Sequence, residues 1–186
     1  VTPEDKADVL WTHPLFTRDG KGLYVITNRG SEHRRLAFLA IPALGEKVLS
    51  TQAHDVDEYA VSSDGTRIAF VTNEGGASVL RFYDAVAQKE LPRPPLFSGA
   101  IDGLQWRPGA REVAFNISSA RVAQDVFSYD YDGNQLVRWT NGNSLTLNAA
   151  VLPEPRLIRW KSFDGREITG LYYHPPSRFE GVRPVV

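Results

Sequence analysis

Ser31, Glu32 and His33 stand next to one another, and they are the residue types of a serine hydrolase: a nucleophile, a carboxylate and a base. Such a group works only when its side chains converge in space, which neighbours in one short loop rarely do. We therefore interpret this run as a structural loop and assign it no catalytic role.

Two acidic stretches offer atoms that could coordinate a metal ion. The run His54–Glu58 lacks the spacing of a metal-ligand motif and is interpreted as a solvated loop between repeats. The stretch Asp130–Asn134 faintly resembles a calcium loop, but Asn141 and Gly142 occupy the region where the required glutamate would stand. We interpret it as an ordinary strand turn, and we predict neither a metal site nor a cofactor site in this chain.

Composition narrows the class of protein. The 186 residues include 21 Lys+Arg and 22 Asp+Glu, so the charge of −1 gives no electrostatic reason to expect nucleic acid or a membrane surface as a partner. The longest fully apolar stretch, Leu36–Ile41, is far shorter than the roughly 20 residues of a membrane helix. The lack of cysteine excludes disulfides, thiolate catalysis and zinc–thiolate sites, and leaves the cellular compartment undetermined.

The elements that must position these residues come from a repeat. Without gaps, and at a spacing of 45 residues, the segments Phe16–Val25, Val61–Phe70 and Trp106–Phe115 align with one another. Each has an apolar residue, a tight turn containing glycine, and then an apolar run that begins at Leu23, Ile68 or Val113. This pattern predicts three β-hairpins.

Further strands follow each hairpin. In the third copy, residues 126–131 alternate between apolar and polar positions, a turn follows at Asp132-Gly133, and a last strand covers Gln135–Thr140. Four short strands in about 45 residues form one blade of a β-propeller. We therefore expect an all-β chain with three four-stranded blades, a partial propeller, and no helix between residues 11 and 145. The four tryptophans, at positions 11, 106, 139 and 160, are expected in blade cores.

Arg121 is the one cation for which we weigh a binding role. It follows the second strand of blade three, on the face where the loops with Arg29, Glu32, Arg34 and Glu74 are expected. It could bind a peptide carboxylate or carbonyl there, and the alternative is a salt bridge on the surface or between blades.

The repeat stops before residue 154. The segment 156–175 instead predicts a separate hairpin with its turn at Asp164-Gly165, and Pro184-Val185-Val186 resembles the start of a buried strand. Three blades do not close a propeller, and the chain contains no methionine. We therefore expect a fragment of a longer protein, with residues 1–150 as a partial propeller and residues 151–186 as the junction to a second domain.

These motifs resemble a known family. Ser62–Phe70 is similar to the TolB-type propeller repeat, and Leu157–Pro175 resembles the junction from propeller to α/β-hydrolase domain in serine peptidases of the prolyl oligopeptidase family. Thr27–His33, Ser118–Arg121 and Asp125–Phe127 are also similar to members of that family. The resemblance implies a peptidase that uses a Ser–Asp–His triad, with the serine in a Gly-x-Ser-x-Gly turn.

None of those catalytic motifs occurs in this sequence, so no catalytic residue is assigned and the chain alone is predicted to be inactive. The resemblance implies that the blades restrict access of short peptides to an active site elsewhere in the protein. The alternatives are a non-enzymatic TolB-like propeller that binds a protein partner, and an esterase or lyase with a similar propeller. We also expect self-association through open blade edges.

Overall fold

Residues 8–142, 152–175 and 181 are described by the structure, a computed structural model. These residues form fourteen strands and no helix, as expected. Blade 1 consists of β1 Trp11–Phe16, β2 Gly22–Thr27, β3 Arg35–Ala40 and β4 Glu46–Val48. Blade 2 consists of β5 Asp55–Val61, β6 Arg67–Glu74, β7 Ala77–Asp84 and β8 Lys89–Glu90. Blade 3 consists of β9 Ala100–Trp106, β10 Glu112–Ser118, β11 Asp125–Asp130 and β12 Gln135–Arg138.

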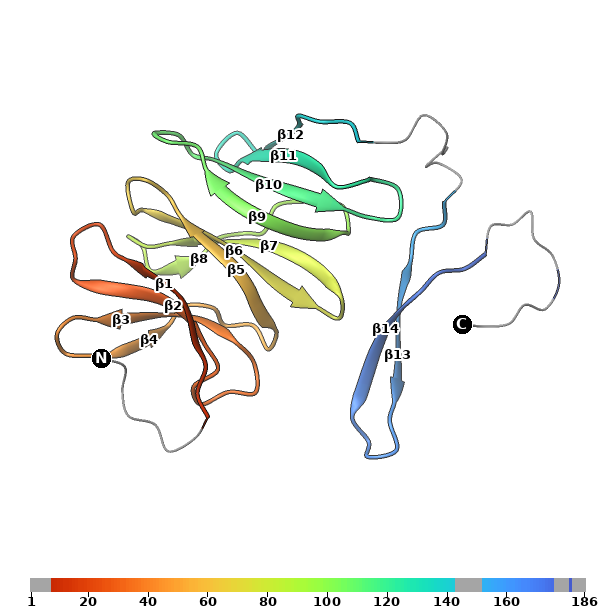
Figure 1. The fold of residues 1–186 in the computed structure, drawn as a ribbon, viewed down its shortest axis with the longest axis horizontal. Helices are drawn as coiled ribbons and strands as arrows, with labels where there is room; N and C mark the ends of the chain where they lie inside the picture. Colours follow the sequence, from red (N-terminus) through yellow and green to blue (C-terminus); the bar gives the residue numbers. More distant parts are fainter. Residues whose placement is uncertain (1–7, 143–151, 176–180, 182–186) are drawn as a thin grey trace.

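Each blade is a four-stranded antiparallel sheet with its strands in chain order (Figure 1). The second strands of the three blades, β2, β6 and β10, begin at residues 22, 67 and 112, so equivalent strands recur every 45 residues. The prediction of a propeller with repeated blades is confirmed. Strand β12 ends at Arg138, before the predicted 140. Beyond it the Trp139 N–H still donates to the Val126 carbonyl, whereas at Thr140 the side-chain hydroxyl, not the backbone, accepts the Val126 N–H.

The turn between the first two strands differs in blade 3. In blades 1 and 2 the glycine with positive φ, Gly20 (68°) or Gly65 (76°), is also the residue whose N–H closes the turn. In blade 3 the positive φ (71°) is at Gly109, after Pro108, and the Ala110 N–H closes the turn. Proline followed by a left-handed glycine is the pattern of a type II turn, so a different turn satisfies the same spacing.

The blades pack through alternate faces of their strands. On β6, Ile68 and Phe70 face blade 1, whereas Ala69 and Val71 face blade 3. We call the contact between blades 1 and 2 the first interface and that between blades 2 and 3 the second interface. All four side chains are fully buried, which is why β6 reads as a continuous apolar run.

Four tryptophans are expected in blade cores, but only two of them lie in a hydrophobic core or pack against one. Trp106 is 7% exposed within the second interface, and Trp11 packs against a small cluster in blade 1. Trp139 and Trp160 are 63% and 48% exposed, so the expectation is wrong for them. Trp139 lies beyond the end of β12, where its indole N–H donates to the Ser128 hydroxyl at 2.7 Å, and Trp160 is on a two-stranded sheet.

The remaining strands, β13 Arg156–Lys161 and β14 Glu167–Tyr172, form the separate hairpin that the sequence predicts. We call it the junction hairpin. It lies beside the blades in Figure 1 and exposes several large apolar side chains, including Phe163 in its turn. The predicted strand at 184–186 and the central part of the loop 141–155 lie outside the described residues. No helix capable of crossing a membrane occurs within the described ranges.

Candidate functional site

One end of the blades carries the loops β2–β3, β6–β7 and β10–β11, and the junction hairpin packs against this end. We call it the junction face. The contact is made at the β6–β7 turn, where Gly75 approaches Leu157 and Gly76 approaches Leu171. A Cβ atom at Gly75 would lie 3.2 Å from Leu157 Cδ1. Both glycines have positive φ, 70° and 94°, so the turn needs their conformational freedom as well as their small size.

A hollow of about 320 Å³ lies between the blades and the junction hairpin. Blades 2 and 3 contribute its floor, and β14 with the segment before β13 contributes its outer wall. Its walls combine aromatic rings, backbone and one carboxylate, from residues that include Phe97, Ala100, Ser119, Glu154, Leu171 and Tyr173. This volume is at the lower end of the range for pockets that hold small ligands.

Arg121 lies at the edge of this hollow, on the β10–β11 loop. Its Nε donates to the Leu152 carbonyl at 3.0 Å, and its Nη1 is 3.3 Å from a carboxylate oxygen of Glu154. The guanidinium is therefore engaged with the segment that leads into the junction hairpin, rather than with another blade. Its side chain is 46% exposed, so solvent weakens the ion pair, and a binding role for Arg121 stays a prediction.

The structure brings together the runs Ser31–His33 and His54–Glu58. The rings of His33, in the β2–β3 loop, and His54, just before β5, have centroids 6.5 Å apart. His33 Nδ1 is 3.8 Å from Asp55 Oδ1. Ser31, in contrast, meets His33 only through the backbone, since its hydroxyl accepts the His33 N–H at 3.0 Å.

Arg34 holds the acidic run 54–58 in place. Its side chain lies 2.6 Å from Asp57 and 3.4 Å from Asp55, and its N–H donates to Asp55 at 2.7 Å. The interpretation of this run as a solvated loop is wrong, because β5 begins at Asp55 and its Val56 is fully buried. These carboxylates bind the two blades together. Within the described part of the chain, no group of three or more His, Cys, Asp or Glu side chains could hold a metal ion.

Glu74 shows how charge is balanced on the junction face. Burial tends to raise the pKa of this carboxyl, but a hydrogen bond and ion pair with Arg81 outweigh that effect, with smaller contributions from His54 and Thr72, so the pKa lies below its ordinary value. Glu74 is therefore ionised and already paired.

The stretch Asp130–Asn134 lies at the opposite end of blade 3, in the β11–β12 turn. The Asp130 carboxylate accepts the N–H groups of Asp132 and Gly133 at 3.1 and 3.2 Å, and the positive φ (49°) falls on Asn134 rather than on glycine. Asp132 pairs with Arg111 at 2.5 Å. The Asp130 carboxylate is thus satisfied within its own turn, as in an ordinary strand turn, and Asp132 is paired with the β9–β10 turn of the same blade.

Sequence reasoning missed the contact between the β6–β7 turn and the junction hairpin. The only local signal is the pair Gly75-Gly76, which predicts a turn but not its partner. The leucines that meet it lie more than 80 residues further along the chain.

The sequence matches no protein-family model and no curated protein. Its fold, however, matches solved peptidases. The puromycin-hydrolyzing peptidase of Mycobacterium tuberculosis aligns with 95% of this chain and 28% of its own, with a TM-score of 0.78 and 18% sequence identity. A puromycin hydrolase aligns with 91% of this chain and 26% of its own, with a TM-score of 0.74 and 20% identity.

A third match is prolyl oligopeptidase B of Galerina marginata, solved with a 35mer hydrolysis and macrocyclization substrate. It aligns with 89% of this chain and 24% of its own, with a TM-score of 0.71 and 14% identity. The chain thus spans about a quarter of the length of the peptidases it matches. The structural likeness is to peptidases of the prolyl oligopeptidase family, and at these identities it establishes the fold.

Proposed function

We propose that this chain is part of a larger serine peptidase of the prolyl oligopeptidase type. Residues 1–150 are its last TolB-like propeller blades, and residues 151–186 are the junction and first strands of an α/β-hydrolase domain. The observation that carries the proposal is the docked junction hairpin. A binding propeller has no need of a non-blade hairpin, whereas 95% of the chain, blades and hairpin together, aligns with one peptidase.

The blades would act as a gate for substrate. A propeller that stands over an active site leaves only narrow routes to it, so short flexible peptides enter and folded proteins do not. The junction face supports this role, because it carries the hairpin that leads toward the second domain. The partner of the intact protein is then a short peptide, and the active-site groups lie outside this chain.

A serine-directed fluorophosphonate probe tests the enzymatic half of the proposal. The protein encoded by the complete reading frame should be labelled and should hydrolyse short peptides, whereas the 186-residue chain should do neither. Labelling of the 186-residue chain would contradict its predicted inactivity. A reading frame without His-Gly-Gly and Gly-x-Ser-x-Gly segments, or one with further blades in their place, would favour the non-enzymatic binding module.

A further inference from the structure

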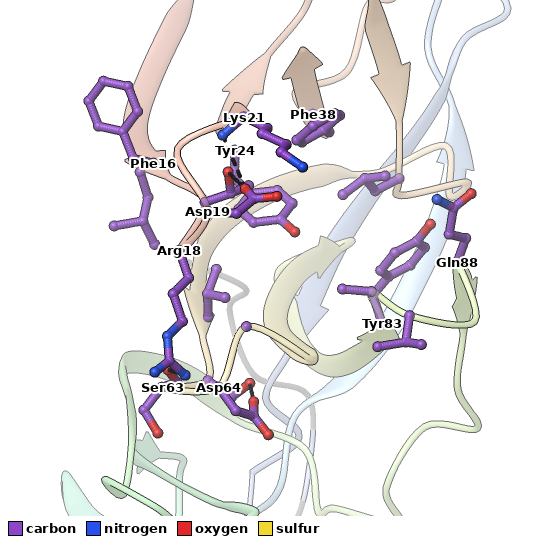
Figure 2. A pocket seen from close by; sticks show the side chains of 18 of the residues that line it. Phe16, Arg18, Asp19, Lys21, Tyr24, Phe38, Ser63, Asp64, Tyr83 and Gln88 are labelled. Carbon is purple, nitrogen blue, oxygen red and sulfur yellow. Dashed lines mark hydrogen bonds between the residues drawn. The ribbon is translucent and has the colours of Figure 1, made fainter. Parts of the chain in front are cut away.

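A second hollow, of about 820 Å³, opens in the first interface at the end of the blades away from the junction face. It lies between the turns of blades 1 and 2 (Figure 2). We propose that this hollow binds a small aromatic anion, that is, an aromatic ring that carries a carboxylate or phosphate group. The proposal is independent of the peptidase function.

The hollow exists because two large side chains of the second interface have small counterparts in the first. In blade 3, Trp106 on β9 is the strand partner of Val113 on β10. In blade 2, Val61 on β5 is the strand partner of Ile68 on β6, so Val61 is the equivalent of Trp106. Tyr131 donates its N–H to the Arg111 carbonyl, and the residue that makes the equivalent bond in blade 2 is Ala85. Val61 and Ala85 both line the hollow.

In the second interface the two large rings fill this space. The ring of Phe82 lies 6.0 Å from that of Trp106 and 5.0 Å from that of Tyr131, between centroids. In the first interface Tyr24 replaces the smaller Ala69 and recovers part of the volume, but the space of the indole stays empty. The first interface is therefore open where the second is packed.

Aromatic side chains form part of the wall of the hollow. Tyr24 and Tyr83 are 9% and 4% exposed, so only parts of their rings face the space. The Phe38 ring lies 5.7 Å from that of Tyr24 and covers Gly22, where a Cβ atom would overlap it. Figure 2 shows Tyr24, Phe38 and Tyr83 around the hollow. Flat rings held in this way suit a flat apolar ligand.

Cations without ion-pair partners line the same space. Arg18, Lys21 and Lys47 contribute to the lining, and none of them forms an ion pair with any residue that the structure describes. The Lys47 ammonium donates to the Gln88 side chain at 2.6 Å, and Arg18 Nη1 is 3.5 Å from the Ser63 carbonyl. Three cations therefore line a hollow whose wall also carries aromatic rings, which favours a ligand with an anionic group.

Two carboxylates also line the hollow, but both are engaged by their own turns. Asp19 accepts the Thr17 hydroxyl at 2.7 Å and the Lys21 N–H at 3.1 Å. Asp64 accepts the Ser62 hydroxyl at 2.6 Å and the Thr66 N–H at 3.0 Å. These bonds occupy Oδ1 of each carboxylate, and the Thr66 hydroxyl also donates to Oδ2 of Asp64. Both carboxylates stay ionised, so the three cations and two anions that line the hollow carry a net charge of +1.

Isothermal titration calorimetry on the 186-residue chain tests the proposal with four probes: phenyl phosphate, benzoate, inorganic phosphate and benzyl alcohol. At least one of the two aromatic anions should bind with 1:1 stoichiometry, and about tenfold more tightly than either probe that lacks the ring or the charge. Which aromatic anion binds better distinguishes a phosphate from a carboxylate ligand. Absence of binding by both aromatic anions, or equal binding of benzyl alcohol, would overturn the proposal.

The variant Val61→Trp places in the first interface the residue that fills the second. Its indole can donate to the Leu15 carbonyl, the counterpart of the Ala60 carbonyl that accepts from Trp106 at 3.0 Å. The variant should keep or raise the melting temperature and lose aromatic-anion binding. Unchanged binding by a folded Val61→Trp protein would contradict the assignment to this hollow.

A charge-removal variant keeps the test decisive if Val61→Trp does not fold. Lys21→Ala/Lys47→Ala should weaken binding of the aromatic anion about tenfold, because two of the three cations are gone. The matched control is Lys89→Ala/Lys161→Ala, which removes two exposed lysines that do not line the hollow. Equal affinity in the two double variants would overturn the proposal.

Discussion

The first and second interfaces join equivalent surfaces of a repeated blade, yet they are packed differently. The second interface contains a continuous core in which Phe82 meets Trp106, Tyr129 and Tyr131. The first has a smaller core beside an open hollow. The repeat therefore sets the positions of the strands, while single residues such as Val61 decide whether an interface is filled. A propeller can keep its geometry and still create a ligand-sized space between two blades.

The two interfaces also differ in their polar links. In every blade the pairing register between the first and second strands shifts within the first strand. In β9 this shift leaves the N–H groups of Gly103 and Leu104 without partners on β10. The Glu58 carboxylate accepts both, at 2.9 and 2.8 Å. In the first interface, the Tyr59 hydroxyl lies 2.5 and 2.9 Å from the carbonyls of His13 and Tyr24, in addition to the ion pairs of Arg34 with Asp55 and Asp57. Burial raises the pKa of Tyr59, so this hydroxyl keeps its proton and donates.

Truncation of equivalent phenylalanines should give the largest difference between the interfaces. Phe82 on β7 pairs with Ala69 on β6. Phe38 on β3 pairs with Tyr24 on β2, which is the equivalent position in blade 1. Phe82→Ala should lower the free energy of unfolding by about 3–5 kcal/mol, because Phe82 is fully buried. Phe38→Ala should lower it by only about 1–2 kcal/mol, because the ring borders an open hollow. Urea unfolding of both variants measures the difference, and equal losses would show that the first interface is as tightly packed as the second.

Removal of the charged link should have an intermediate effect. Glu58→Gln replaces one acceptor oxygen by an amide NH₂ that cannot accept the Leu104 or Gly103 N–H, and it should lower the free energy of unfolding by about 1–2 kcal/mol. Tyr59→Phe, the matched change in the first interface, should cost about 0.5–1.5 kcal/mol. Urea unfolding at pH 7 compares them. A Glu58→Gln protein as stable as the parent would show that the bonds to β9 do not hold blades 2 and 3 together.

The smallest expected effect concerns pH and the turn of blade 2. A hydrogen bond from Ser62, supported by Thr66, lowers the pKa of Asp64 to about 2, against 3.8 for the free group. A carboxyl with a lowered folded pKa stabilises the fold above pH 4, and this contribution is lost as the pH falls from 4 to 2. Since Asp64 is exposed, the loss should be only about 0.5 kcal/mol.

The pH profile of unfolding checks this turn. Asp64→Asn should remove that part of the acid destabilisation, while Asp8→Asn, an exposed aspartate near the start of the chain, should leave it unchanged. Identical profiles for Asp64→Asn and the parent between pH 5 and 2 would contradict the role of the turn. Blade 3, which has Gly109 in the turn, has no equivalent carboxylate.

The blades were predictable because their turns and apolar runs recur at one spacing and depend on local conformation. The start of β5 at Asp55 was not, since the charged residues of that strand hide its alternation, and Arg34 from the preceding blade stabilises them there. The exposure of Trp139 and Trp160 depends on where each sheet ends. The hollow at Val61 and the docking of Leu157 on Gly75 depend on contacts between distant segments, which spacing alone does not reveal.

We propose above that these blades belong to a peptidase and restrict its substrates. The most direct test is a cleavage assay with the complete protein and one peptide sequence in two forms, free in solution and inside a stably folded domain. We predict that the free peptide is cleaved and the folded form is not, and that unfolding the domain restores cleavage. Equal cleavage of the free and folded forms, or cleavage of neither, would contradict it.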